Sequence, residues 1–179
     1  FATAASFSAA LLLGAAASAQ DFPTKSIRLL QGFPAGGNAD ILARSIGEEI
    51  ARSTGQSVIA EAKPGASGNL ATQEAIRAAP DGYTLVQITT AHVISPALMK
   101  APMFDPLNDL EFVSKVADFP FFIAVHKDSP YKTINELIAA AKEKPGALTW
   151  GSAGNGSGQH MCGELMALAT GVKTVHVPF

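Results

Sequence analysis

Two glycine-rich loops hold the residues of this sequence that are best suited to binding an anion. The first runs from Phe33 to Asn38 (FPAGGN) and the second from Ser152 to Gly158 (SAGNGSG), and each lies between a predicted strand and a predicted helix. Backbone N–H groups are free at the start of a helix, and the helix dipole adds about half a positive charge there. Two such loops could grip an anion from both sides. Either loop alone fits a tight turn equally well.

Three motifs of phosphate binding and nucleophilic catalysis do not match the second loop. A Walker A loop needs Lys and then Ser or Thr after its last glycine, and no such run is present. Gly154 and Gly156 fit the start of a dinucleotide-binding fingerprint, but Gln159 stands where its third glycine belongs. Ser157 lacks the flanking glycines of a nucleophile elbow, because Asn155 and Gln159 occupy those positions. These mismatches disfavour nucleotide binding and elbow-type hydrolysis.

The histidines show no spacing typical of a metal site; they are His92, His126, His160 and His176. His160 and Glu164 lie four residues apart and could share a metal, although such a pair is more typical of a surface hydrogen bond. His92 follows a predicted strand, where it could bind a ligand or cap the loop. Asp40 lies in the first turn of a predicted helix and would repel an anionic ligand unless it faces away or holds an amino group. The sequence predicts no catalytic residue, no metal and no cofactor.

Alternating strand-like and helix-like segments must position these loops. Short β-type runs lie at 27–30, 58–60, 83–88, 112–116, 121–125, 148–150 and 175–177. Helices are predicted from about Ala39 to Gly55, from Leu70 to Ala79, from Thr133 to before Pro145, and from Gln159 to Thr170. Three prolines, at 96, 102 and 106, predict an irregular stretch. The βαβα rhythm indicates an α/β fold with mostly parallel sheets and helices on both faces.

The composition excludes several classes of protein. Hydrophobic residues make up 47% of the 179 residues and charged residues 16%, which excludes a disordered chain. The formal net charge is −2 and no basic stripe is present, so we expect no nucleic-acid partner. The single cysteine, Cys162, cannot form an intramolecular disulfide or a cysteine-based zinc cluster.

The first 19 residues resemble a signal peptide that lacks its front. They carry no charge, include three consecutive leucines and end in Ala17-Ser18-Ala19, the small-residue pattern that signal peptidase accepts. An uncleaved membrane anchor is the alternative, since about 18 apolar residues can cross a bilayer. We expect cleavage before Gln20 and a periplasmic mature chain. The chain stops in a predicted strand at Phe179, and we expect the natural protein to continue.

Five ordered motifs resemble the Bug family, the periplasmic receptors of tripartite tricarboxylate transporters. In chain order they read FPAGGNAD at 33–40, EAKPGASGN at 61–69, APDGYTL at 79–85, SAGNGS at 152–157 and VHVPF at 175–179. The second motif departs from the family pattern at Ala62, where the family has Asn. Gln31-Gly32 also stands where the family often has Val-Pro. The resemblance covers the whole chain after residue 19.

The resemblance implies a two-lobed, type II periplasmic binding protein fold of the Venus-flytrap kind, cut short at its C-terminus. Lobe 1 would span 20–120 and lobe 2 would span 121–179, both incomplete. The ligand would be a small organic acid: a di- or tricarboxylate, an aromatic acid or an acidic amino acid. The partners would be membrane permease subunits, and the receptor would be a monomer. Carried over by position, the ligand-binding residues would be Ala35, Gly36, Gly37, Asn38, Thr89, Thr90, His92, Ser152, Ala153, Asn155, Gly156 and Ser157.

Two alternative functions remain open at this point. A binding module of the same kind could pass its closed form to a receptor kinase, which the sequence does not distinguish from transport. A secreted hydrolase would need Ser157, His160 and an acid in one constellation. No acid partner is evident in the sequence, so we expect binding without catalysis.

Overall fold

The computed structural model describes residues 21–179, which form two groups of helices and strands around two parallel sheets. The first sheet has the strand order β2-β1-β3 and the second pairs β4 with β5. The strands are β1 (Ile27–Gln31), β2 (Val58–Ala62), β3 (Thr84–Gln87), β4 (Thr149–Ser152) and β5 (Val175–Pro178). The helices are α1 (Asn38–Thr54), η1 (Ala66–Gly68), α2 (Asn69–Arg77), α3 (Thr90–Leu98), α4 (Ile134–Glu143) and α5 (Gly158–Thr170).

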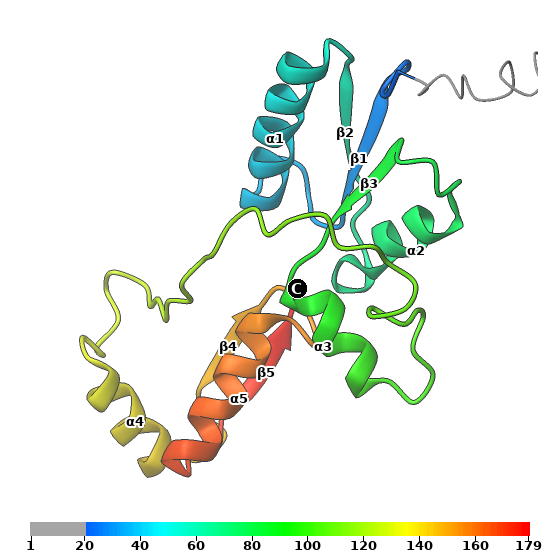
Figure 1. Cartoon of the computed structure of the whole chain (residues 1–179). Coiled ribbons are helices and arrows are strands. Elements are labelled where there is room, and N and C mark those ends of the chain that lie inside the picture. The colour runs from blue at the N-terminus through cyan, green and yellow to red at the C-terminus, as the bar shows by residue number, and fades with distance from the viewer. Residues whose placement is uncertain (1–20) are drawn as a thin grey trace, which may run out of the picture.

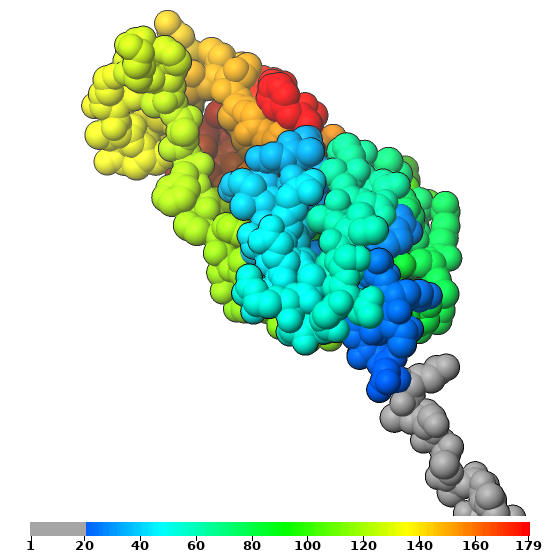
Figure 2. All heavy atoms as spheres, turned by 90° about the horizontal axis from the view of Figure 1, so that it is seen from above, coloured from blue at the N-terminus to red at the C-terminus, as the bar shows by residue number. Residues whose placement is uncertain are grey.

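The two sheets present their carboxyl ends to each other across the middle of the molecule (Figure 1). The strands of the first sheet run toward α3, and β5 ends beside the start of the same helix (Figure 1). An irregular segment, residues 99–133, crosses from the first group to α4. In Figure 2 the two groups form two masses in contact, and this segment passes along one side of both. Loops that follow β1, β3 and β4 therefore face one central region.

The core of the first group forms on β1, the central strand. Leu29 and Leu30 of β1 are buried, and Ala43 of α1 and Ala71 of α2 are fully buried against the sheet. Burial of these apolar side chains stabilises the sheet at roughly 25 cal/mol per Å² of apolar surface removed from water. Gln31, the last residue of β1, is also fully buried although it is polar. Gln31 directly precedes the first glycine-rich loop, and its buried side chain bonds to the backbone of that loop at Phe33.

Local signals in the sequence located several helix ends. Thr133 caps α4 in the predicted capping box: its hydroxyl accepts the backbone N–H of Glu136 at 3.3 Å, and the Glu136 carboxylate accepts the N–H of Thr133 at 3.2 Å. Gly55 and Gly171 end α1 and α5 in the left-handed conformation that suits glycine. The predicted start of α5 at Gln159 is one residue late, since Ser157 is the capping residue.

Two predicted strands, at 112–116 and 121–125, are wrong. Neither segment is paired with a strand of residues 21–179, and they expose Val113 (83%) and Phe122 (84%). Alternating apolar residues report β propensity, whereas a strand also needs a neighbouring backbone to accept its hydrogen bonds. No such neighbour lies among the described residues.

The irregular stretch predicted from Pro96 is also wrong at its start, because α3 covers Thr90–Leu98 and contains Pro96. Thr89 and His92 form a capping box that fixes the first turn. Pro96 lies in the last turn of the helix, so its missing N–H removes one hydrogen bond near the end of a short helix. Ser95 and Pro96 are buried, so packing against the neighbouring elements holds this turn in place.

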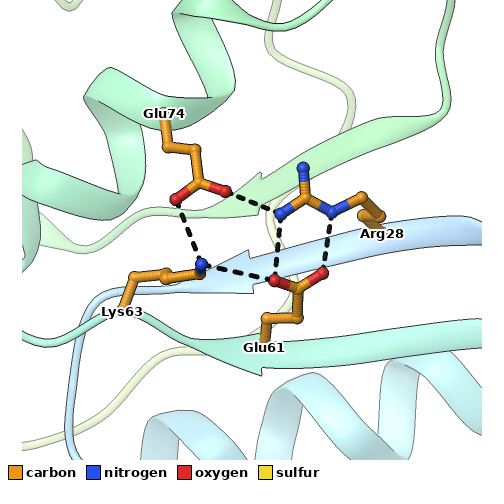
Figure 3. Close-up of polar contacts among 4 residues, drawn as sticks. All are labelled: Arg28, Glu61, Lys63 and Glu74. Carbon is orange, nitrogen blue, oxygen red and sulfur yellow. Dashed lines mark hydrogen bonds and ion pairs between the residues drawn. The ribbon is translucent and has the colours of Figure 1, made fainter.

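Four charged side chains form a closed ion-pair network across β1, β2 and α2 (Figure 3). Arg28 binds Glu61 through two bonds of 2.7 and 2.9 Å and binds Glu74 at 2.6 Å. Lys63 lies 3.5 Å from Glu61 and 3.3 Å from Glu74. The hydrogen bonds from Arg28 lower the pKa of both carboxyl groups and raise that of the guanidinium. The network ties the sheet to α2.

Replacing Glu61 with glutamine should lower the melting temperature by roughly 3 °C at neutral pH, because Arg28 loses its bidentate partner. The pKa of Glu61 is depressed from its ordinary 4.5 in the folded state, so its contribution is present above that pH and is lost as the pH falls through the folded value. Melting curves of the two proteins should therefore converge in acid. Glu49→Gln, in an exposed pair with Arg52, is the control and should leave the melting temperature unchanged. A Glu61→Gln difference that persists in acid would contradict the ion-pair explanation.

No helix of residues 21–179 is both long and apolar enough to cross a membrane. The predicted signal peptide, residues 1–19, lies outside the described residues.

Candidate functional site

The first glycine-rich loop is held by the buried carboxylate of Asp40. The Asp40 side chain, 6% exposed, accepts the backbone N–H of Gly36 at 3.0 Å and two bonds from Arg44 at 3.0 and 3.2 Å. Gln31 lies below the loop, where its Oε1 accepts the N–H of Phe33 at 2.8 Å. The bond from Arg44, and then that from Gly36, lowers the pKa of Asp40. Asp40 therefore faces the loop and Arg44 rather than a ligand, and its charge is compensated.

Asp40→Ala should lower the melting temperature by roughly 5 °C at neutral pH, because Gly36 and Arg44 both lose their acceptor. Since the loop loses its anchor, ligand affinity should fall as well. Differential scanning calorimetry together with titration calorimetry measures both effects. Arg44→Gln separates the two: its side chain is about half exposed, so it should cost stability while leaving the Gly36 bond and the affinity intact. Equal losses of affinity in both variants would contradict the anchoring role.

The start of α3 is closed by the side chains of its own capping box. Thr89 accepts the N–H of Ala91 at 3.3 Å, and the Nδ1 atom of His92 accepts the N–H of Thr89 at 2.9 Å. His92 is fully buried; its ring lies 6.3 Å from that of Phe33, measured between centroids, and its Nε2 atom faces Gly68. Burial lowers the pKa of His92, so the ring is neutral. The capping role of His92 is present in the structure, and its ligand-binding role stays a prediction.

The second glycine-rich loop is held by bonds within its own group. Ser152 accepts the N–H of Gly154 at 3.2 Å and lies 2.7 Å from Nε2 of His176. Ser157 caps α5 by accepting the N–H of His160 at 3.2 Å. Both serines are buried, whereas Asn155 is exposed and Ala153 is half-buried. The two hydroxyls support the loop, and the backbone around Asn155 forms its accessible part.

The second loop contacts the first group directly. The hydroxyl of Ser67, in η1, donates to the backbone carbonyl of Asn155 at 2.9 Å. A Cβ atom at Gly156 would lie 2.7 Å from Cβ of Ser95, and one at Gly158 would lie 2.8 Å from Oγ1 of Thr90. Sequence reasoning missed Ser67 and Ser95 as neighbours of the site. Ser67 lies in the PGASG turn at 64–68, whose glycines were the available signal.

Three helix N-termini converge where these loops meet. The loop that leads into α1 approaches α3 through the rings of Phe33 and His92, and α3 meets α5 where Thr90 lies beside Gly158. Several backbone N–H groups at these termini have no acceptor within residues 21–179; they belong to Asn38, Ala39, Thr90, Asn155, Gly158 and Gln159. Such groups hold an anion without a permanently buried positive charge. The predicted residues Ala35, Gly36, Gly37 and Asn38 are exposed at this place, as is Thr90.

The arrangement around Ser157 does not form a hydrolase triad. The Ser157 hydroxyl accepts the backbone N–H of His160, while the ring of His160 accepts the N–H of Gly156 through Nδ1 at 3.1 Å. The imidazole therefore contacts the loop backbone, and no bond joins it to the hydroxyl that it would have to activate. His160 Nε2 lies 3.9 Å from Glu164, and residues 21–179 contain no cluster of three or more side chains able to hold a metal.

Comparison with known proteins identifies the family. The model of the tripartite tricarboxylate transporter family receptor matches residues 42–179. The chain belongs to this receptor family. Among curated relatives of the receptor, the UPF0065 protein in the gbd 5′ region of Cupriavidus necator is 42% identical over 165 residues, which is 92% of this chain and 50% of the relative. Protein BugT of Bordetella pertussis is 30% identical over 93% of this chain and 52% of its own length. The receptor chain thus spans about half the length of the curated relatives it matches.

Solved structures confirm the fold class of the receptor. Rpa4515 of R. palustris, solved with adipate, matches with a TM-score of 0.83 and 31% identity over 88% of this chain and 53% of that one. MatC of Rhodopseudomonas palustris, with bound malate, matches with a TM-score of 0.80 and 30% identity over 88% and 54%. The receptor therefore has the α/β fold of periplasmic solute-binding proteins, as the sequence predicted. The division into lobes at residues 120 and 121 stays a prediction.

Proposed function

We propose that this receptor captures a small organic carboxylate in the periplasm and delivers it to the membrane subunits of a tripartite tricarboxylate transporter. The convergence of three helix N-termini at the facing ends of two parallel sheets carries this proposal. Each terminus contributes about half a positive charge together with free N–H donors. The ligand class comprises di- and tricarboxylates, aromatic acids and acidic amino acids. Relatives of similar fold solved with adipate and with malate support a carboxylate ligand.

Capture would proceed without chemistry. A carboxylate docks on the α1 terminus at Asn38 and Ala39, and the β4–α5 loop covers its other side. The bond from Ser67 to the carbonyl of Asn155 is a contact that closure would form, since it joins the two groups. A ligand that bridges both groups favours the closed state in proportion to its greater affinity for that state. Membrane subunits would then recognise the closed form.

Thermal-shift and titration calorimetry on the full-length protein test the ligand class. Adipate and malate are the probes, and adipamide, which has the carbon skeleton of adipate without its charge, is the matched control. A carboxylate present at about 100 times its dissociation constant should raise the free energy of unfolding by roughly 2.7 kcal/mol, and adipamide should raise it by nothing measurable. A panel of mono-, di- and tricarboxylates, aromatic acids and acidic amino acids then ranks the class. No shift with any anion of the panel, or equal shifts with the amide, would overturn the proposal.

A further inference from the structure

Two histidines stack behind the second glycine-rich loop. The rings of His160 and His176 are 4.2 Å apart between centroids and tilted by only 15°, and Trp150 of β4 lies 4.5 Å from His176. His160 is in the first turn of α5 and His176 is in β5, so the stack joins the helix to the sheet. The side chain of His160 is 19% exposed and His176 is half-buried. The function proposed above does not account for this pair.

Each ring also bonds to the loop. The N–H of Gly156 donates to Nδ1 of His160 at 3.1 Å. Nε2 of His176 lies 2.7 Å from the hydroxyl of Ser152, which in turn accepts the N–H of Gly154 at 3.2 Å. The stack therefore supports the loop at two points, on either side of the exposed Asn155. These bonds help to set the path of the backbone that would face the ligand.

The bond from Gly156 requires a neutral ring. Because Nδ1 of His160 accepts a proton donor, its lone pair must be free, and the neutral ring carries its hydrogen on Nε2, toward Glu164. A second proton can only be added at Nδ1, where it would place one N–H against another. Two imidazolium rings at the stacking distance would also repel each other. Burial, followed by the charge of His160, lowers the pKa of His176.

The surroundings offer limited compensation for added charge. Glu164, 3.9 Å from Nε2 of His160, is the charged side chain that faces the pair. The strand β4 contributes Trp150 and the hydroxyl of Ser152, which do not titrate in this range. Glu164 favours a proton on the stack but lies on the Nε2 side, so it cannot restore the acceptor that Gly156 loses.

We propose that His160 and His176 are positioning residues that hold the β4–α5 loop in its anion-binding shape while both rings are neutral, so that acidification releases this arm of the site. The inference rests on the function proposed above, since it assigns the loop to the ligand. The receptor would bind carboxylates more tightly at higher pH.

The test follows two readouts of the full-length protein between about pH 8 and pH 5.5. The first is the backbone amide of Gly156 in ¹⁵N NMR, recorded without ligand. The second is the affinity for adipate and malate by titration calorimetry. His160→Asn keeps an acceptor oxygen at the Nδ1 position but does not titrate, and His160→Phe keeps the ring without an acceptor. His126→Asn, in the exposed segment between α3 and α4, is the matched control.

In the wild type the chemical shift of the Gly156 amide should change with pH, and the amide should lose its protection from hydrogen exchange in acid. The affinity for adipate and malate should weaken about tenfold in acid, as for one lost hydrogen bond. His160→Asn should abolish both dependences, His160→Phe should bind weakly throughout, and His126→Asn should match the wild type. The inference would be overturned if the chemical shift and exchange protection of the Gly156 amide do not change with pH. It would also be overturned if His160→Asn shows the same pH dependence of affinity as the wild type. If the amide titrates as expected but no carboxylate binds at any pH, the positioning geometry stands while the proposed function, and with it the gating of ligand binding, fails.

Discussion

Replacing Gly156 with alanine should weaken carboxylate binding about a hundredfold. Gly156 has a φ of +79°, which alanine adopts at a cost, and its added Cβ would lie 2.7 Å from Cβ and 2.9 Å from Cα of Ser95 in α3. Because one of these atoms belongs to the backbone of a packed helix, the loop must move away from α3. The α5 terminus would then no longer meet the α3 terminus, and the anion would lose one of its three groups of donors.

Gly171→Ala is the matched control for this prediction. Gly171 has a φ of +70° and open space around the position of an added Cβ atom. This variant should therefore lose about 1 kcal/mol of stability from the left-handed backbone and should cause no clash. Its affinity for adipate should equal that of the wild type in titration calorimetry. If Gly156→Ala also binds normally, the seating of the loop against α3 is not needed for binding.

Gly32→Ala should destabilise the protein by about 3 kcal/mol, the upper end of what overpacking normally costs. A Cβ atom at Gly32 would lie 2.3 Å from Cα and 2.6 Å from the carbonyl oxygen of Gly68. Both partners are backbone, so no side chain can rotate to relieve the overlap. The end of β1 and η1 would therefore move apart. Phe33 and His92 lie against Gly68 of η1, so this movement would also disturb their packing.

Urea unfolding of Gly32→Ala and Gly47→Ala separates close backbone contact from the general cost of replacing a glycine. Gly47 lies in α1, and its added Cβ would meet only the side chain of Val58 at 3.2 Å. Alanine favours a helix by about 1 kcal/mol over glycine, so Gly47→Ala should be neutral or stabilising. Similar unfolding midpoints for the two variants would show that the approach of Gly32 to Gly68 has little energetic weight.

The helices α1, α2, α4 and α5 and all five strands could be predicted because their signals are local. The capping box at Thr133 and the left-handed glycines at 55 and 171 each act within a few residues, so they can be read without knowing the fold. The segments 112–116 and 121–125 show the limit of this reasoning. Their apolar alternation is local, but a strand exists only where another backbone pairs with it. Pro96 shows the opposite case, in which packing keeps a helix that the proline disfavours.

For the candidate site, the sequence predicted the location of the loops but not the roles of the side chains. The sequence placed glycine-rich loops at the carboxyl ends of two strands, where ligands collect in open α/β sheets, so anion binding could be proposed from pattern and spacing. That the two loops belong to separate sheets whose carboxyl ends face each other is seen in the structure. The roles of individual side chains could not be proposed in this way. Asp40 accepts hydrogen bonds from Arg44 and Gly36, and His92 caps the start of α3. Ser157 caps α5 and does not act as an activated nucleophile.

The sequence by itself determined the α/β class, the parallel strands and the two loops, because periodicity and turn chemistry act over a few residues. Only the tertiary structure decided that Ser67 reaches Asn155, that Gly156 seats against Ser95, and that His160 stacks on His176. Ser67 and Asn155 are separated by 88 positions in the chain. Contacts between such distant residues depend on how whole elements pack, and backbone hydrogen bonds and close packing fix that arrangement only when the entire fold is in place.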